Sequence, residues 1–354
     1  MLKQVFIIVS LLFSPPILAE VGTYDSVREL FSKDFWKNKK GTKKRVIEKA
    51  KVSIVRDFMK MCLKPSQSQR VTLDAVIKNM GFSMEELPTL KKRCEKISTW
   101  YIEDKGLNAI LLTGENITDV TPLQYLVQVN KLSLRNNNIR DISPLSKLVN
   151  LKDISLSNNP IKDISPLEKL KQLERLSIYN DNVIDISPLG QIKSLKSLSI
   201  SSKNKNKNIL KSLTNLKTLS VSGTTENICD IAELTTLEKL YLSRTGTKDI
   251  SCLSPLKELK NFEFSYLPIS DISVVSNFTK LEMIRIKEVP VEDISVLKPL
   301  KYLRSVRITH TKITDASPLS GKKLDNFDAY KSPLRWCSPK TWEDVIEGVS
   351  CYEK

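Results

Sequence analysis

Hydrophobic residues recur through most of the chain with a period of 21 or 22 residues. Each copy contains leucine-x-x-leucine-x-leucine or a close variant, and the copies begin at Leu107, Val129, Leu151, Leu173, Leu195, Leu216, Leu237, Leu259, Leu281, Leu303 and Leu324. The leucine-x-leucine part has the two-residue period of a β-strand that is apolar on one side only. A period of this length is typical of a solenoid. The pattern therefore predicts eleven short parallel strands that share one interior.

A second motif, Asp-Ile-Ser-Pro-Leu, lies between the strand segments at 141–145, 163–167 and 185–189. Degenerate copies begin at Asp119, Asp249, Asp271, Asp293 and Asp315. A serine followed by proline suits the N-cap and the first position of a helix, so we expect one helical turn on the side away from the strands.

Asparagine follows the strand segments at Asn137 and Asn159, where the chain must leave the sheet. A buried asparagine side chain there can satisfy backbone groups of its own coil and of a neighbouring coil. Later copies replace it, for example with Thr245 and Leu267, so we expect a less regular ladder in the C-terminal half. The lysine-rich and asparagine-rich segment 201–209 breaks the pattern and is expected to bulge as a loop.

These motifs resemble the 22-residue leucine-rich repeats of the bacterial internalins, and the resemblance covers about residues 106–334. It implies an α/β repeat solenoid, shaped as an arc, with a parallel sheet on its concave face and about eleven coils. In such families a helical cap closes the first coil, and the concave face usually binds another protein. Residues 335–354 resemble the short cysteine-bearing C-terminal cap of exported leucine-rich repeat proteins.

The N-terminal region carries a targeting signal and a helical segment. Residues 1–19, with an apolar run before Pro15-Pro16 and Ile17-Leu18-Ala19, read as a cleavable signal peptide. We therefore expect a secreted or periplasmic monomer that does not span a membrane. Residues 20–105 lack the repeat and form the expected N-terminal cap. Helical spacing runs over 43–62, 71–80 and 84–101, with Thr42 and Ser83 as N-caps.

The six cysteines can pair in the oxidising surroundings that export implies. We expect Cys62 to pair with Cys94, and Cys337 with Cys351, because each pair lies inside one expected cap. Cys229 and Cys252 fall on the same side of consecutive coils, where either a disulfide or two buried thiols fits the pattern.

The sequence contains no motif typical of catalysis or of cofactor binding. The chain has one histidine, His310, no cysteine pair with zinc spacing and no phosphate-binding glycine loop. We therefore expect no enzymatic activity, no metal and no cofactor.

The net charge of +16 favours an acidic partner. The outward strand positions hold serines in the middle coils and larger side chains toward the C-terminus. The expected partner-binding residues, including two at strand ends, are Tyr241, Glu263, Tyr266, Arg285, Lys287, Arg307, His310 and Tyr330. Tyrosine and arginine dominate binding hot spots, so the sequence predicts a protein partner with an acidic surface.

An alternative is a polyanion binder, of anionic lipid or polysaccharide, that uses the N-terminal helical region. Its basic patch would be formed by Lys37, Lys39, Lys40, Lys43, Lys44 and Arg45. Nucleic acid is not expected, because no aromatic residues interleave these basic residues.

Overall fold

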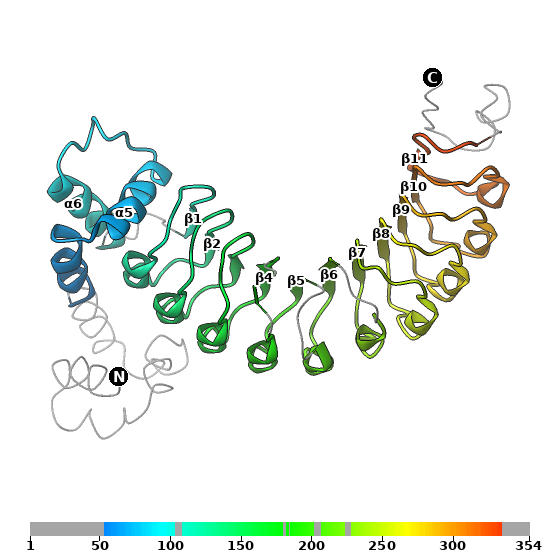
Figure 1. The fold of residues 1–354 in the computed structure, drawn as a ribbon, viewed down its shortest axis with the longest axis horizontal. Helices are drawn as coiled ribbons and strands as arrows, with labels where there is room; N and C mark the ends of the chain where they lie inside the picture. The colour runs from blue at the N-terminus through cyan, green and yellow to red at the C-terminus, as the bar shows by residue number, and fades with distance from the viewer. Residues whose placement is uncertain are drawn as a thin grey trace, which may run out of the picture.

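The computed structural model describes residues 53–102, 108–179, 182–183, 185–201, 207–223 and 228–334. Within them, eleven strands pair in chain order as one parallel sheet. The strands are β1 (Ala109–Leu111), β2 (Lys131–Ser133), β3 (Asp153–Ser155), β4 (Arg175–Ile178), β5 (Ser197–Ser201), β6 (Thr218–Ser222), β7 (Lys239–Ser243), β8 (Asn261–Ser265), β9 (Met283–Lys287), β10 (Ser305–Thr309) and β11 (Asn326–Asp328). The sheet lines the concave face of an arc (Figure 1), which confirms the predicted leucine-rich repeat solenoid. We number the coils 1 to 11 by their strands.

The hydrophobic period places the strand side chains as predicted. Ile154 and Leu156 are fully buried in the shared interior, and Ser155 faces the other way. Ser157 also faces outward, yet only 1% of it is exposed. Its hydroxyl contacts the Ser177 hydroxyl and accepts a hydrogen bond from the Tyr179 N–H. An outward position is therefore not always an accessible one.

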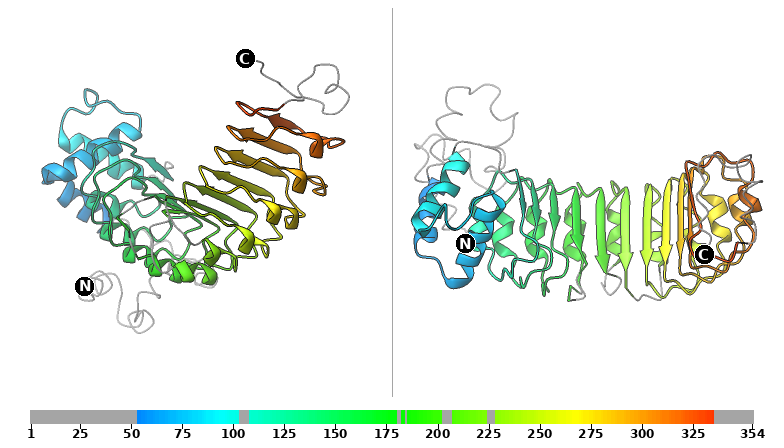
Figure 2. Two further views of the ribbon diagram at one scale, coloured as in Figure 1. Left: turned by 45° about the vertical axis from the view of Figure 1, so that its right-hand side comes forward. Right: turned by 90° about the horizontal axis from the view of Figure 1, so that it is seen from above.

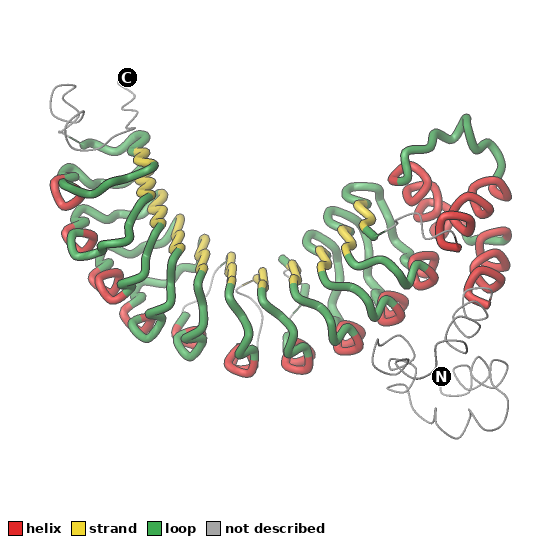
Figure 3. The backbone as a smooth tube through the Cα atoms, turned by 180° about the vertical axis from the view of Figure 1, so that it is seen from behind, coloured by secondary structure: helices red, strands yellow, loops and turns green. Residues whose placement is uncertain are grey.

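Short 3-10 helices form the convex side of the arc (Figure 3). They are η1 (Thr121–Tyr125), η2 (Ser143–Lys147), η3 (Ser165–Lys169), η4 (Ser187–Gln191), η5 (Lys207–Ser212), η6 (Cys229–Ile231), η7 (Ser251–Leu253), η8 (Ser273–Asn277), η9 (Ser295–Leu297) and η10 (Ser317–Leu319). The expected bulge at 201–209 is wrong at both ends, because Ser201 pairs with Ser222 and η5 begins at Lys207. Residues 202–206 lie outside the described residues.

The aspartate of the second motif, not the serine, caps these helices. Ser165 is already the first helical residue, and its N–H donates to Asp163 Oδ1 at 2.8 Å. The same bond, from the N–H two residues later, is accepted by Asp119, Asp141, Asp185, Asp249, Asp271, Asp293 and Asp315. The predicted serine cap is therefore wrong. The carboxylate two residues earlier accepts the hydrogen bond from the free N–H at the start of the helix.

The expected asparagine ladder joins the early coils. Asn159 Nδ2 donates to the carbonyl oxygen of Leu134 in the preceding coil at 2.8 Å and to that of Leu156 at 2.9 Å. Its Oδ1 accepts the Ile139 N–H at 3.1 Å. Asn137 repeats this arrangement one coil earlier. In coil 7 the position is Thr245, a buried residue whose hydroxyl has no partner among the described residues, so the ladder is less regular in the C-terminal half, as expected.

Among the described residues, three helices precede the first coil. The first covers 53–63, so the described part of the expected helix 43–62 is helical. The second, α5 (Gln67–Asn79), begins after a Ser66 capping box. The third, α6 (Leu90–Ile102), begins six residues later than predicted. Ser83 caps a separate turn instead, because Pro88 disfavours a helical conformation at the residue before it.

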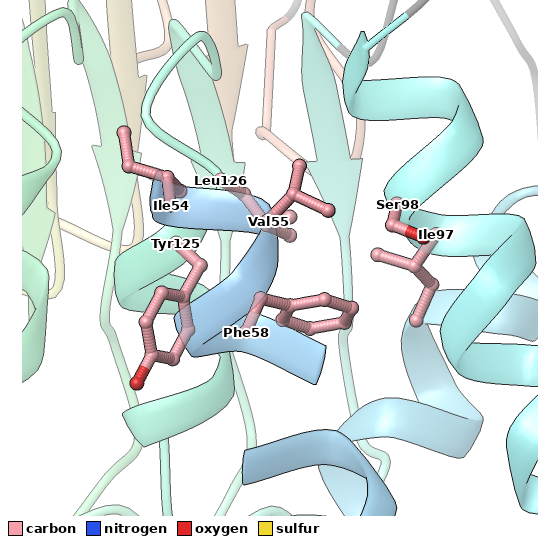
Figure 4. A pocket seen from close by; sticks show the side chains of 7 residues that line it. All are labelled: Ile54, Val55, Phe58, Ile97, Ser98, Tyr125 and Leu126. Carbon is pink, nitrogen blue, oxygen red and sulfur yellow. The ribbon is translucent and has the colours of Figure 1, made fainter. Parts of the chain in front are cut away.

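Helix α5 covers the open end of coil 1. Thr72 is fully buried there, and its hydroxyl donates to the Asp119 carbonyl oxygen at 2.6 Å. Asn79 Nδ2 donates to the Leu111 carbonyl oxygen at 3.2 Å. Phe58 packs edge-on against Tyr125, with 5.8 Å between ring centroids, beside an apolar recess (Figure 4). Burial, together with the nearby Asp57, raises the pKa of Tyr125.

Two disulfides are present among the described residues. Cys62–Cys94 ties the first helix to α6, as predicted. Cys229–Cys252 joins η6 to η7, so these two cysteines form a disulfide and are not two buried thiols. The predicted Cys337–Cys351 pair, the C-terminal cap 335–354, the signal peptide 1–19 and the N-cap Thr42 lie outside the described residues. No helix in the described part of the chain is long and apolar enough to cross a bilayer.

Candidate partner-binding surface

One row of outward side chains, here called the central row, crosses the middle of the concave sheet. Strand register aligns its members as Leu111, Ser133, Ser155, Ser177, Ser199, Ser220, Tyr241, Glu263, Arg285, Arg307 and Asp328. The strands lie side by side along the arc (Figure 2), so neighbours in the row are about 4.8 Å apart. The row is therefore small and polar in coils 2 to 6, and large or charged from coil 7 onward.

The C-terminal part of the central row is electrostatically mixed. Arg285 Nη1 lies 3.3 Å from Glu263 Oε2 and forms an ion pair with it. Arg307 is in register with Arg285 on one side and with Asp328 on the other. Arg307 makes no ion pair of 4.0 Å or less within the described part of the chain. The expected like-charge cluster is thus reduced to one cation without an ion pair.

Tyr241 is the first large residue of this row and is partly buried. Burial, followed by the neighbouring Glu263 carboxylate, raises the pKa of its hydroxyl. The hydroxyl therefore stays protonated near neutral pH and can donate a hydrogen bond.

Residues that follow the strands form a left-handed column. They have φ between 51° and 59° at Asn136, Asn158, Arg244, Tyr266, Glu288, His310 and Lys331, and 97° at Gly223. Asparagine and glycine adopt this conformation readily, whereas other residues pay roughly 1 kcal/mol or more. The column changes from asparagine and glycine to large side chains at coil 7. The sequence placed Tyr266 and His310 at strand ends correctly, but missed Arg244, Glu288 and Lys331.

Aromatic rings and cations meet at this column. The Arg244 guanidinium carbon lies 4.7 Å from the Tyr266 ring centroid, and Lys287 Nζ lies 5.2 Å from the same centroid. The His310 and Tyr330 ring centroids are 5.9 Å apart, and Lys331 Nζ lies 5.2 Å from the Tyr330 centroid. We call the set the C-terminal rim, formed by Arg244, Tyr266, Lys287, Glu288, His310, Tyr330 and Lys331.

The opposite edge of the sheet, where the strands begin, contains ion pairs between neighbouring coils. Glu238 lies 3.0 Å from Lys260 Nζ and 3.3 Å from Lys217 Nζ. Hydrogen bonds from Lys260 and then Lys217 lower the pKa of the Glu238 carboxyl. Arg244 and Lys331 of the C-terminal rim, in contrast, make no ion pair with any residue the structure describes. Arg244 and Lys331 therefore offer positive charge to a partner at the strand exits.

The concave surface of the middle coils also carries a large side chain, which the serine pattern of the sequence does not indicate. The Tyr179 hydroxyl hydrogen-bonds the Ser220 hydroxyl, so this side chain reaches from the end of β4 to β6. Tyr179 is not among the partner-binding residues expected from the sequence. Its position immediately after Ile178, at the end of an outward serine pattern, was the available signal.

No group of three or more His, Cys, Asp or Glu side chains within the described ranges could hold a metal ion. The predicted basic patch from Lys37 to Arg45 lies outside those ranges.

Comparisons with known proteins define the class of this chain. A model of leucine-rich repeats in two copies matches residues 127–169 and 149–189. Internalin C2 of Listeria monocytogenes is similar at 25% identity and a TM-score of 0.50, over 61% of this chain and 92% of that chain. A leucine-rich repeat protein of Leptospira interrogans is similar in fold, with 20% identity and a TM-score of 0.53, over 65% and 62% of the two chains. The search of curated proteins returned no match.

The chain therefore contains leucine-rich repeats and has the fold of a leucine-rich repeat solenoid. Within that class it is internalin-like, as its 22-residue repeats predicted.

Proposed function

We propose that this protein is an exported, non-enzymatic binding protein whose concave face contacts an acidic surface of another protein. Leucine-rich repeats commonly mediate protein–protein interaction, and the proposal places that contact in coils 7 to 11. The observation that carries it is the change of the central row from serine to Tyr241, Glu263, Arg285 and Arg307. Arg307 is its anchor, because this cation has no ion pair within the described residues.

Export and domain organisation are part of the proposal. The disulfides Cys62–Cys94 and Cys229–Cys252 favour an oxidising compartment. We infer a signal peptide over 1–19, a helical cap over 20–105, repeats over 106–334 and a short cap over 335–354. The mature chain is a monomer that is secreted or periplasmic.

Partner capture with matched charge reversals tests this proposal. The chain without residues 1–19 is immobilised and exposed to extracts of neighbouring or host cells. Arg307→Glu is compared with Lys301→Glu, an exposed lysine on the turn between η9 and β10. Both variants change the net charge equally. We expect a specific protein to be captured by the wild-type chain and by Lys301→Glu, and to be lost with Arg307→Glu.

The polyanion alternative predicts a different pattern. Lys39→Glu with Lys40→Glu would then abolish capture, Arg307→Glu would not, and binding would weaken steeply with salt. That result would move the binding site to the N-terminal basic patch and overturn the concave-face proposal.

A further inference from the structure

The residue types in the left-handed column suggest a selected function at the C-terminal rim. Asn136, Asn158 and Gly223 fill this position in the earlier coils, so the fold accommodates residues that suit the backbone. Arg244, Tyr266 and His310 hold the same backbone conformation with φ of 53°, 56° and 52°. Such strain persists where a side chain is required for another purpose, and it is concentrated at binding sites. The backbone alone does not favour these side chains.

The contacts show what the rings do. Arg244 and Lys287 lie near the Tyr266 ring at 4.7 and 5.2 Å, and Lys331 lies 5.2 Å from the Tyr330 ring. A ring that holds a cation restricts its motion and leaves the charge in contact with solvent. The tyrosines therefore position three cations along the C-terminal rim before any partner binds, which lowers the entropy cost of binding.

The cations are regularly spaced. Arg244 and Lys331 follow the strands of coils 7 and 11, and Lys287 is the last residue of β9 in coil 9. Neighbouring parallel strands are about 4.8 Å apart, so the backbone positions of successive cations are separated by about 10 Å. A segment in the extended polyproline II conformation advances about 3.1 Å per residue with three residues per turn, so side chains three residues apart lie on one side and are separated by about 9 Å.

We propose that the C-terminal rim binds an extended acidic segment of the protein partner, with carboxylates at every third residue. This inference rests on the proposed function and specifies its partner. Charge complementarity supports it, since Arg244 and Lys331 have no ion pair in the described part of the chain. Glu288 is the one acidic member of the rim, and it lies 3.9 Å from Lys287 Nζ. Glu288 therefore competes with an incoming carboxylate and limits affinity.

Two synthetic peptides of one composition test the spacing. Both have nine residues, three glutamates and six serines or glycines, with glutamate at positions 1, 4 and 7 in one and at 1, 2 and 3 in the other. Fluorescence anisotropy measures their binding to the mature chain. We expect the spaced peptide to bind at least fivefold more tightly. Equal affinities would overturn the proposal.

Variants link that preference to the rim. Tyr266→Asn should weaken binding of the spaced peptide at least fivefold without lowering the melting temperature, because asparagine tolerates the left-handed conformation. Glu288→Gln should strengthen binding about threefold, and Lys301→Gln should leave it unchanged. Unchanged binding in both Tyr266→Asn and Glu288→Gln would also overturn the proposal.

The outcomes separate this inference from the proposed function. If Arg307→Glu abolishes partner capture while the two peptides bind equally, the concave-face function stands and the acidic-segment inference fails. Binding of dextran sulfate that Tyr266→Asn removes, with no binding of either peptide, would assign the rim to a polysaccharide and overturn the peptide proposal.

Discussion

Glu263 and Arg285 form an ion pair across β8 and β9, with 3.3 Å between Glu263 Oε2 and Arg285 Nη1. Both side chains are partly exposed, so the pair contributes at most about 1 kcal/mol to stability. Its main effect is on recognition, because it partly neutralises Arg285 and leaves Arg307 as the available cation of the central row.

We predict that exchanging this pair preserves partner capture. The double variant Glu263→Arg with Arg285→Glu keeps both the ion pair and the net charge, so captured protein should stay within about twofold of wild type. Arg307→Glu should reduce it by at least tenfold. Quantitative capture measures both. Loss of capture in the exchanged variant would show that Arg285 itself contacts the partner.

The asparagine ladder predicts that substitutions at equivalent positions of different coils lower stability by unequal amounts. Asn159→Ala removes partners from buried backbone groups of Leu134, Leu156 and Ile139, and should lower the free energy of unfolding by about 3 kcal/mol. Thr245→Val is the matched control in coil 7, where the buried hydroxyl has no described partner, and should be neutral or stabilising. Urea denaturation measures both. Equal losses would contradict the ladder.

The strand register predicts opposite effects at adjacent residues. Ile308→Asp places a charge in the interior and should unfold coils near β10, with a loss of at least about 4 kcal/mol. Thr309→Asp faces outward in register with Lys287 and should change stability by less than about 0.5 kcal/mol. Thermal unfolding followed by circular dichroism distinguishes them. Similar losses would mean that the register is wrong.

The two described disulfides should each stabilise the chain. Replacing Cys62 and Cys94 by serine, or Cys229 and Cys252, should each cost roughly 3 kcal/mol by loop entropy. Denaturation under non-reducing conditions measures the cost, and peptide mapping identifies the bonds. Recovery of all four as free thiols from exported protein would refute this prediction.

The aspartate caps predict acid sensitivity. Hydrogen bonds from the Ser251 and Ser317 backbone and hydroxyl groups lower the pKa of Asp249 and of Asp315 below the ordinary 3.8. A carboxyl whose folded pKa is lowered stabilises the fold above its unfolded pKa, and this contribution is lost as pH falls below 3.8 through the folded pKa. Asp249→Asn with Asp315→Asn keeps an acceptor but removes the titration. Its melting temperature should fall less than that of wild type between pH 5 and pH 2, measured by calorimetry.

The sequence by itself determined the solenoid, the strand positions and the interior residues. The reason is local, because the leucine-x-leucine period assigns each side chain to one face and a polar residue inside would be strongly destabilising. It also predicted the asparagine ladder, the Cys62–Cys94 bond and the change from serine to Tyr241 and the arginines.

Other features were decided only by the tertiary structure. The partner of Arg285, the reach of Tyr179 and the Cys229–Cys252 bond depend on distances between side chains about 20 to 40 residues apart in the chain. The left-handed column depends on backbone angles that the packed turns impose, against the preference of residues such as Tyr266. Neither kind of information is contained in a periodic pattern, because the period fixes which face a residue occupies and not what its side chain reaches.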